Sequence, residues 1–253
     1  MPDIIYGRHP VVAALRQPDT PLEEVIVAQG AGGQWLHEVK RLARAAGVRL
    51  RLQERAVLDR VCGTQNHQGI LARRGSYVYR DLGALLDDLA MLTGPALLVA
   101  ADGLTDPMNL GNLCRSAFAA GAQGIIIPKD RAAGVTPVVI KAAAGALEYL
   151  PVYRVTNLAD CLGSLRDAGL AIIGAAADAP ESIYDTDLTR PLVLVIGSED
   201  KGMRPRVRKQ CDLVASIPMA AREIGSLNAA TSGAVALFEA RRQRLQALNQ
   251  PDG

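Results

Sequence analysis

Residues 96–115 of the chain read ALLVAADGLTDPMNLGNLCR, and this stretch decides the fold class. An apolar run, Ala96 to Ala100, is followed by a turn and helix start rich in Asp, Asn and Gly at residues 106–115. Two more apolar runs, 192–196 and 213–217, precede the turns 197–202 and 226–228. Ligands of open α/β sheets bind outside the carboxyl ends of the strands, so the three turns predict one binding site.

The apolar runs extend through the whole C-terminal part of the chain. Further strands are expected at 124–127, 152–155 and 170–174, with helix-compatible segments between most of them. Continuous apolar strands that alternate with helices are typical of a parallel sheet covered on both faces. The sequence therefore predicts an α/β domain over residues 94–253.

Residues 1–75 predict a second, smaller α/β unit. Expected helices are Val11 to Leu15 and Trp35 to Ala46, the second of them ended by Gly47. Expected strands lie at 24–28, 48–52 and 69–72. Residues 76–93, which carry Asp81, Asp87 and Asp88, are expected to be a linker with one short helix.

Composition and charge narrow the class of protein. The chain has 253 residues, 49% of them hydrophobic, which is ample for a packed core. Residues 1–80 hold 12 Lys and Arg against 7 Asp and Glu. This asymmetry favours a phosphate-rich partner, although a solvated basic surface would give the same pattern.

Targeting and redox signals point to the cytoplasm. The N-terminus carries no basic and apolar leader, and no run approaches the roughly 20 apolar residues of a membrane helix. We therefore expect a cytoplasmic protein with no membrane partner. The four cysteines are scattered without a CxxC pair, so reduced thiols are expected rather than a zinc site or a disulfide framework.

The side chains in the three turns suggest the chemistry of the site. The dinucleotide fingerprint GxGxxG and the Walker A motif are both missing. Amides, a carboxylate, a hydroxyl and a guanidinium are present instead, and none of them forms a convincing metal site; the residues are Asn109, Arg115, Glu199, Ser226 and Asn228. Each of these residues could instead have a purely structural role, since Asn and Ser often cap helices and Glu in a turn often only faces solvent. Their joint arrangement favours a functional site.

These turns resemble the motifs of the SpoU branch of the SPOUT superfamily, RNA 2′-O-ribose methyltransferases that use S-adenosylmethionine. The first motif matches as Asp106-Pro107-x-Asn109-x-Gly111-x-x-x-Arg115. The second matches as Gly197-x-Glu199-x-x-Gly202, and the third as Ser216-Ile217-Pro218-Met219 followed by Ser226-Leu227-Asn228. The match spans residues 97–240, with Asp200, Ala229 and Ala230 departing from the commonest pattern.

The resemblance implies a fold and a division of roles. It implies a Rossmann-like sheet with a deep C-terminal trefoil knot and a homodimer whose active site is completed across the interface. It places the cofactor against Ile196, Gly197, Gly202, Ile217, Met219 and Leu227. It places Arg115 where the family activates the ribose hydroxyl, with Asn109 and Glu199 orienting it and Ser226 and Asn228 positioning the substrate.

The N-terminal part resembles the ribosomal-protein-like RNA-binding domain of bacterial 23S rRNA guanosine 2′-O-methyltransferases. The stretches that carry this resemblance are Tyr6 to Val11 and His67 to Gly69. They imply RNA contacts by Arg8, His9, His67 and Gln68. A lone loop His is more often a structural hydrogen-bonder, and the chain's aromatic content of 4% argues against recognition by base stacking.

The sequence therefore predicts 2′-O-methylation of RNA, and a guanosine in large-subunit rRNA is the favoured substrate. One alternative is a tRNA substrate or an rRNA site linked to antibiotic resistance. Another is a catalytically silent RNA-binding factor of ribosome assembly. The presence of Asn109, Arg115 and Glu199 favours the enzyme over the silent factor.

Overall fold

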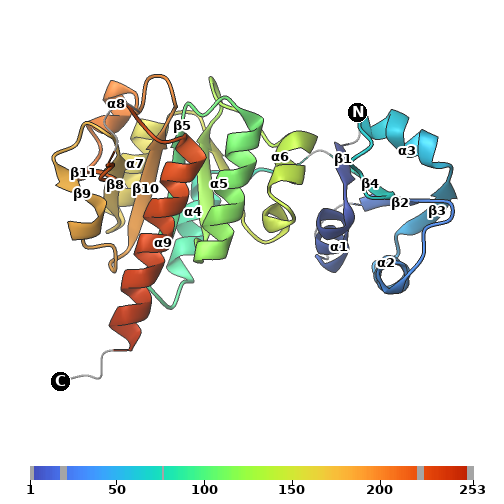
Figure 1. Cartoon of the computed structure of the whole chain (residues 1–253). Coiled ribbons are helices and arrows are strands. Elements are labelled where there is room, and N and C mark those ends of the chain that lie inside the picture. Colours follow the sequence, from blue (N-terminus) through green and yellow to red (C-terminus); the bar gives the residue numbers. More distant parts are fainter. Residues whose placement is uncertain (1–2, 18–21, 76, 221–224, 250–253) are drawn as a thin grey trace. The chain divides into compact units, whose positions relative to one another are not determined.

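A computed structural model of the chain describes residues 3–17, 22–75, 77–220 and 225–249. The chain divides into two units, each built around its own sheet (Figure 1). Unit 1 comprises Met1–Val78 together with Val135–Tyr149. Unit 2 comprises Tyr79–Gly134 together with Leu150–Gly253.

Unit 2 is built on a seven-stranded sheet in the order β7-β6-β5-β10-β8-β11-β9. Each neighbouring pair is parallel. The strands are β5 (Leu97–Asp102), β6 (Gly124–Pro128), β7 (Val152–Val155), β8 (Ala171–Ala175), β9 (Glu181–Ser182), β10 (Leu192–Gly197) and β11 (Leu213–Ser216). The predicted parallel α/β sheet is confirmed, since all six apolar runs form strands. The seventh strand, β9, was not predicted, because it has only two residues, both polar.

Helices cover both faces of this sheet. On one face α5 and α9 pack side by side, and a Cβ on Gly233 would lie 2.4 Å from a methyl of Leu113 (Figure 1). The other face carries a core to which α4, α7 and α8 contribute. The bounds are α4 (Leu82–Ala90), α5 (Pro107–Ala120), α7 (Leu158–Asp167), η2 (Ile183–Asp185), α8 (Pro205–Arg208) and α9 (Ala229–Leu248).

The expected linker, 76–93, belongs largely to unit 2. Leu85 of α4 is 1% exposed and lies in the core of that unit. The Tyr153 hydroxyl donates a hydrogen bond of 2.5 Å to Asp88, and Arg80 pairs with the same carboxylate at 2.6 Å. Leucines at 82, 85, 86 and 89 follow the helical period. The segment therefore packs against the sheet as an amphipathic helix and is not a solvated linker.

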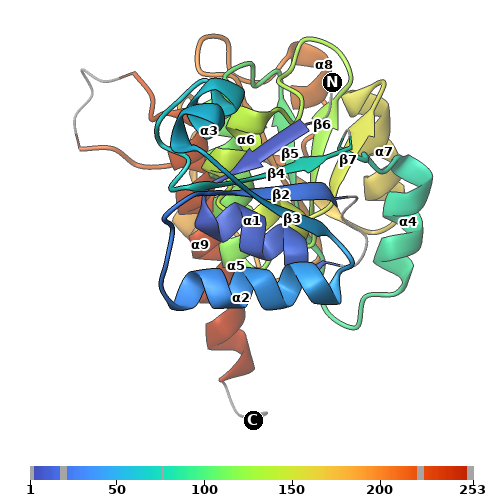
Figure 2. The same cartoon turned by 90° about the vertical axis from the view of Figure 1, so that its right-hand side faces the viewer.

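Unit 1 has a four-stranded sheet in the order β1-β4-β2-β3. Strand β4 runs antiparallel to β1 and β2, while β2 and β3 are parallel. Helices α1 and α2 lie on one face and α3 lies on the other (Figure 2). The bounds are β1 (Asp3–Tyr6), α1 (Arg8–Arg16), β2 (Leu22–Ala28), α2 (Gln34–Ala45), β3 (Arg49–Gln53), α3 (Arg55–Cys62) and β4 (Ile70–Arg74). Sequence patterning missed β1 and α3.

Unit 1 also contains a segment from the middle of the sequence. Between β6 and β7 the chain forms α6 (Pro137–Ala142) and η1 (Ala146–Glu148), which pack on β1 and α1 respectively. Arg74 and Glu148 form an ion pair of 2.9 Å whose side chains are 4% and 3% exposed. The two units are therefore not divided at the predicted residues, because 135–149 joins the unit expected to end at residue 75. Over the described ranges, no helix is long and apolar enough to span a membrane.

Candidate functional site

The first turn places Asn109 in the opening turn of α5. Asp106 caps this helix, its carboxylate accepting from the Met108 N–H at 3.0 Å, and Pro107 occupies the first helical position. The capping role that Asn109 could have had is therefore taken by Asp106. The Asn109 side chain is left to make other contacts.

Asn109 connects the three turns by hydrogen bonds. Its Nδ2 donates to Oε1 of Glu199, and its Oδ1 accepts from Nδ2 of Asn228 at 3.0 Å. Asn228 also caps α9, because its Oδ1 accepts from the backbone of Ala230 at 2.9 Å and of Thr231 at 3.2 Å. The cap fixes which end of the Asn228 amide faces Asn109. The hydrogen bonds therefore all run one way: Asn228 donates to Asn109, and Asn109 donates to Glu199.

The second turn is a closed loop that requires glycine. Ser198 and Gly202 exchange two backbone hydrogen bonds, of 3.1 and 2.9 Å. A Cβ added to Gly197 would lie 2.3 Å from the carbonyl carbon of Gly202 and from the nitrogen of Met203. The chain thus returns directly over Gly197, and the tip of the turn presents Glu199.

A buried carboxylate fastens this turn to the neighbouring strand. Asp102, the last residue of β5, is fully buried and lies opposite Gly197 in the sheet. It accepts from the Arg204 backbone at 2.7 Å and from its Nε at 2.6 Å, and Nη2 lies 2.5 Å away. The sequence did not predict this pair, because the partners are 102 residues apart and Arg204 belongs to a basic cluster at 204–209, formed by Arg204, Arg206, Arg208 and Lys209.

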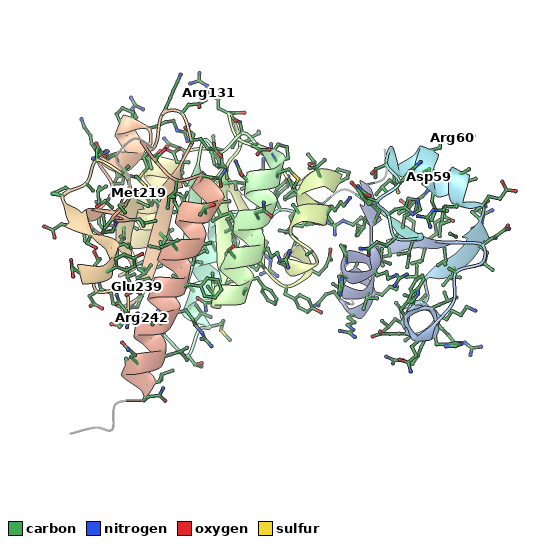
Figure 3. The ribbon with its side chains drawn as sticks, viewed as in Figure 1. Asp59, Arg60, Arg131, Met219, Glu239 and Arg242 are labelled. Carbon is green, nitrogen blue, oxygen red and sulfur yellow. The ribbon has the colours of Figure 1, made fainter. Side chains whose placement is uncertain are left out.

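A cavity of about 300 Å³ lies among the loops that follow β8, β10 and β11. Glu199 and Ser226 line it, as do Ala175 to Asp178 after β8. Met219, labelled in Figure 3, is another wall residue. All six residues predicted to hold the cofactor line this one cavity: Ile196, Gly197, Gly202, Ile217, Met219 and Leu227.

An ion pair that the sequence did not predict also lines the cavity. Arg208 Nη1 lies 3.0 Å from Asp178 Oδ1. The hydrogen bond from Arg208 holds the pKa of Asp178 below its usual value. Two members of the basic cluster at 204–209 are therefore engaged with carboxylates of this chain, while Arg206 and Lys209 are exposed.

Arg115 is not part of the same hydrogen-bonded group. It is exposed on α5, six residues beyond Asn109, which corresponds to about 9 Å along the axis and a different face of the helix. Within the described part of the chain, Arg115 makes no hydrogen bond or ion pair. Exposed Met108 and Phe118 share its stripe of α5, at 50% and 42% exposure.

Three of the four predicted RNA-binding residues lie at the start of α1 and the loop before β4. The Arg8 N–H donates to Gln68 Oε1 at 2.9 Å, and the Arg8 guanidinium stacks 4.4 Å from the Trp35 ring centroid. His9 and Gln68 are exposed. The structure therefore places Arg8, His9 and Gln68 where a partner can reach them.

His67 is different, and a direct RNA contact by it is wrong. Its side chain is fully buried. Nδ1 accepts from the Gly69 N–H at 3.0 Å, so the ring proton sits on Nε2, which donates to Asp59 at 2.7 Å. Both nitrogens are used to shape the loop before β4. A sequence pattern does not distinguish a buried loop histidine from an exposed one.

The site contains neither a reactive thiol nor a metal cluster in the residues that are described. Cys114, next to Arg115, is buried, and burial raises its pKa to about 12. A thiol of that acidity stays protonated near neutral pH and is a poor nucleophile. Among the described residues, no three His, Cys, Asp or Glu side chains gather as metal ligands would.

Comparison with family models finds two matches. The model of the SpoU rRNA Methylase family matches residues 96–238. A second model, RNA 2′-O ribose methyltransferase substrate binding, matches residues 4–79.

Curated proteins and solved structures agree with those matches. The chain is 42% identical over 242 residues to the 23S rRNA (guanosine-2′-O-)-methyltransferase RlmB of Nitrosomonas europaea, covering 96% of this chain and 92% of that protein. It is 41% identical to the protein of the same name from Shewanella oneidensis, covering 96% and 98%. The SpoU methyltransferase AviRb from Streptomyces viridochromogenes, solved with the cofactor AdoMet, superposes with a TM-score of 0.80 at 28% identity, covering 96% of this chain and 90% of that one.

Proposed function

The chain belongs to the SpoU rRNA methylase family, and we propose that it transfers a methyl group from S-adenosylmethionine to the 2′-oxygen of a guanosine in 23S rRNA. The observation that carries the proposal is the arrangement around the cavity: the predicted cofactor residues line it, and the group Asn109, Glu199 and Asn228 lies at its edge. The guanosine substrate is the one named for the RlmB relatives.

The residues around the cavity fit S-adenosylmethionine. The cavity's volume of about 300 Å³ is at the lower end of the range for small-molecule sites. Ile196, Ile217 and Leu227 offer apolar walls that suit an adenine ring. The Glu199 carboxylate borders the cavity and suits a sulfonium cation. When bound, this cofactor supplies an electrophilic methyl group.

The protein's own part in the reaction is to orient a ribose hydroxyl and manage its proton. Attack requires the oxygen to be aligned with the methyl carbon and to lose its proton as it attacks. Because its side chain is held on both sides, Asn109 supplies a fixed amide next to the Glu199 carboxylate, and these two groups orient the ribose. Ser226, on the cavity wall, positions the substrate together with Asn228.

Arg115 acts on the same hydroxyl in this proposal. A guanidinium is a poor base in water, so Arg115 contacts the RNA phosphate and the hydroxyl together. It either accepts the hydroxyl proton transiently and passes it to water, or stabilises the developing alkoxide while water takes the proton directly. Its separation from Asn109 within one chain supports completion of the site by a second copy. We propose a homodimer in which the exposed α5 stripe of Met108, Arg115 and Phe118 forms part of the interface.

Two further features of the family are proposed for this chain. One is the deep trefoil knot, supported by the strand order and by the return of the chain from β11 to α9, which packs against α5. The other is a ribosomal-protein-like RNA-binding role for unit 1, supported by the substrate-binding match over residues 4–79. We place the reaction in the cytoplasm, where bacterial rRNA is made.

Ribose-methylation mapping of rRNA and tRNA from cells with and without the gene tests the function. The proposal expects loss of one 2′-O-methylguanosine in 23S rRNA, restored by the wild-type gene. Loss of a tRNA site instead would overturn the substrate. Loss of no site would favour a silent RNA-binding factor.

A further inference from the structure

We propose that Lys129 and Arg131, on the loop after β6, bind phosphates of the substrate RNA next to the first turn. The inference rests on the proposed function, since it takes RNA as the substrate. Sequence reasoning selected neither residue, because the loop contains no motif that marks it. The structure shows the loop at the edge of the sheet that also carries the three turns.

The loop is fixed between its neighbours at the carboxyl ends of the strands. Strands β5, β6 and β7 are adjacent and parallel, so their following loops meet at one edge. The Ala133 N–H donates to the Leu104 carbonyl at 2.7 Å, and the Lys129 N–H donates to the Val155 carbonyl at 2.7 Å. Leu104 lies five residues before Asn109, so this loop adjoins the segment that carries the predicted ribose-binding amide. Figure 3 shows Arg131 at this edge of unit 2.

The positive charges of this loop are available to a partner. Lys129 and Arg131 are exposed, and in the described ranges neither side chain makes a hydrogen bond, an ion pair or a ring contact. Three other arginines near this edge are engaged internally, Arg204 with Asp102, Arg208 with Asp178 and Arg154 over the Tyr79 ring, whereas Arg206 is exposed. Within the loop, the one opposite charge is that of Asp130.

The backbone of Arg131 gives a second, independent indication. Its φ of 58° lies in the left-handed region, where a residue with a Cβ is disfavoured. Its carbonyl also faces Gly103, whose added Cβ would lie 3.9 Å from it. Folding would be served better by glycine or asparagine here, so the arginine side chain provides something other than stability.

A phosphate is the ligand that this pair of charges fits. A guanidinium forms two parallel hydrogen bonds to phosphate oxygens, while an ammonium acts as a point charge. Contacts of this kind fix the register of a nucleic acid and carry no base preference. Lys129 and Arg131 therefore hold the strand that delivers the ribose to Asn109, and sequence selection is left to other residues.

The test measures binding of an unmodified 23S rRNA fragment over a series of salt concentrations. The variants are Arg131→Gln and the double variant Lys129→Gln with Arg131→Gln. The matched control is Arg166→Gln, because Arg166 is exposed in the last turn of α7, which places it toward the amino-terminal edge of the sheet. Arg131→Gly is included because it removes the charge and also relaxes the left-handed backbone.

Each lost contact should lower the slope of log affinity against log salt by about 0.7 to 1. We therefore expect a reduction of about 1 for Arg131→Gln and nearly twice that for the double variant. Arg131→Gly should show the same loss of slope with a melting temperature at or above that of the wild type. The KM for S-adenosylmethionine should not change, while the KM for RNA should rise.

An unchanged slope and affinity in the double variant would overturn the inference, as would an equal effect of Arg166→Gln. The binding assay does not require methyl transfer. A wild-type protein that binds the fragment but never methylates it would contradict the proposed function and leave the binding test valid.

Discussion

Asn109 has a defined hydrogen-bonding direction, and this is the sharpest property of the site at the scale of single residues. Asn228 donates to it and Glu199 accepts from it, so the amide works as an acceptor on one side and a donor on the other. A carboxylate at the same position would keep the shape and lose the donor. The site therefore distinguishes Asn from Asp by charge rather than by size.

Asn109→Asp should lower kcat at least about tenfold near pH 8, equivalent to about 1.4 kcal/mol. Two carboxylates in contact raise the pKa of one of them, so the variant should recover relative to wild type as pH falls and a protonated carboxyl donates in place of the amide. A pH–rate profile measures this. Asn157→Asp is the control, because Asn157 caps α7 and Asp is an equally good cap. Parallel profiles for variant and wild type would contradict the assigned direction.

The turn motifs could be found from sequence at this scale, but several residue environments could not. Strand-end motifs placed Asn109, Glu199 and Asn228 in one site, and the structure joins them. Burial of His67 and the pairing of Asp102 with Arg204 depend on contacts between distant segments. Hydrophobic period and turn composition are local signals and carry no information about such contacts.

At the scale of elements, the closed turn after β10 links the proposed cofactor side of the site to the proposed substrate side. Its backbone passes over Gly197, and its tip carries Glu199. The shape of the turn therefore sets both the cavity wall and the position of the carboxylate.

Gly197→Ala should open this turn and weaken binding of S-adenosylmethionine. The new methyl would lie 2.3 Å from backbone atoms, which cannot move aside as a side chain can, and overpacking typically costs about 1–3 kcal/mol. Calorimetric titration with the cofactor and a thermal melt measure the two effects. Gly94→Ala is the control, since nothing lies within 4 Å of its added Cβ. Equal cofactor affinity in the Gly197 variant and the wild type would refute this account of the turn.

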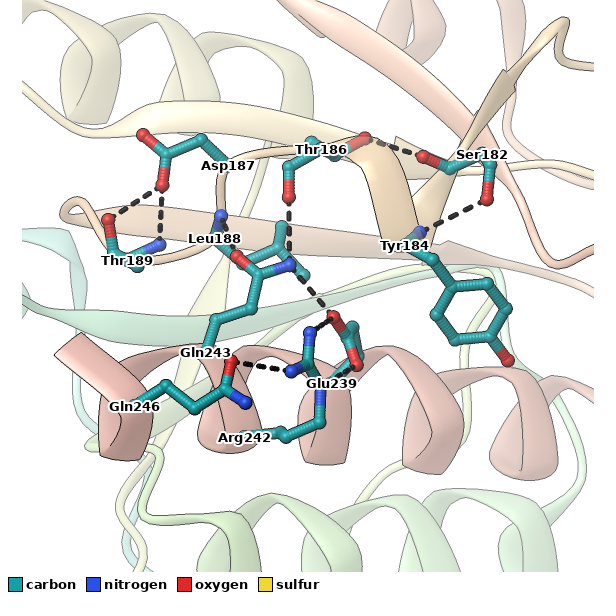
Figure 4. Close-up of polar contacts among 10 residues, drawn as sticks. All are labelled: Ser182, Tyr184, Thr186, Asp187, Leu188, Thr189, Glu239, Arg242, Gln243 and Gln246. Atoms are coloured by element: carbon teal, nitrogen blue, oxygen red, sulfur yellow. Dashed lines mark hydrogen bonds and ion pairs between the residues drawn. The ribbon is translucent and has the colours of Figure 1, made fainter. Parts of the chain in front are cut away.

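The Gln243 amide connects helix α9 to the segment 182–189 (Figure 4), where Arg244 Nε also donates to the Leu188 carbonyl at 3.1 Å. Gln243 Nε2 donates to the Thr186 carbonyl at 3.0 Å and to Glu239 at 2.9 Å, and its Oε1 accepts from the Leu188 N–H at 2.9 Å. The hydrogen bond from Arg242 holds the pKa of Glu239 below its usual value. This carboxylate therefore stabilises the fold above its unfolded pKa and loses that effect as pH falls.

Gln243→Glu should destabilise unit 2 by about 1–3 kcal/mol at neutral pH, because it turns a carboxylate toward a carbonyl and toward Glu239. The repulsion raises the pKa of the carboxyl pair, so the loss should shrink as the solution is acidified. Urea unfolding at pH 7.5 and pH 5 measures both effects. Gln246→Glu is the matched control, since Gln246 accepts from Arg242 at 2.6 Å and gains from a negative charge. Equal unfolding free energies for the two variants would contradict the role of Gln243.

The elements themselves were predictable where an apolar run or period was long. Six of the seven strands of unit 2 and helix α2 follow directly from such patterns. Helix α4 was expected only as a short helix within a linker, because its two acids and the capping Asp81 outweighed its leucine period. Strand β1 (DIIY) has only two consecutive aliphatic residues, and in helix α3 (RAVLDRVC) charged residues interrupt the apolar ones.

At the scale of the whole molecule, the two units are not two consecutive stretches of the chain. Unit 1 takes in Val135–Tyr149, and the Arg74–Glu148 ion pair is buried within it. No local pattern could reveal this, since the segment lies between two strands of the other unit. A fragment that ends near residue 78 would leave the buried Arg74 without its carboxylate partner.

The proposed dimer can be tested by mixing two inactive variants. Arg115→Ala and Asn109→Ala should each be inactive alone, and co-refolding them should restore part of the activity if each site takes Arg115 from one copy and Asn109 from the other. Wild type mixed with either variant serves as the control for exchange of chains. Failure of exchanged mixtures to regain activity would contradict a site completed across the interface.

The central claim is the transfer of a methyl group to a ribose oxygen in 23S rRNA. The most direct measurement incubates the protein with labelled S-adenosylmethionine and unmodified 23S rRNA, then digests the RNA to nucleosides for mass analysis. We expect label in 2′-O-methylguanosine alone, at one site in each rRNA molecule. Label on a base, or no label from protein shown to bind the cofactor, would contradict it.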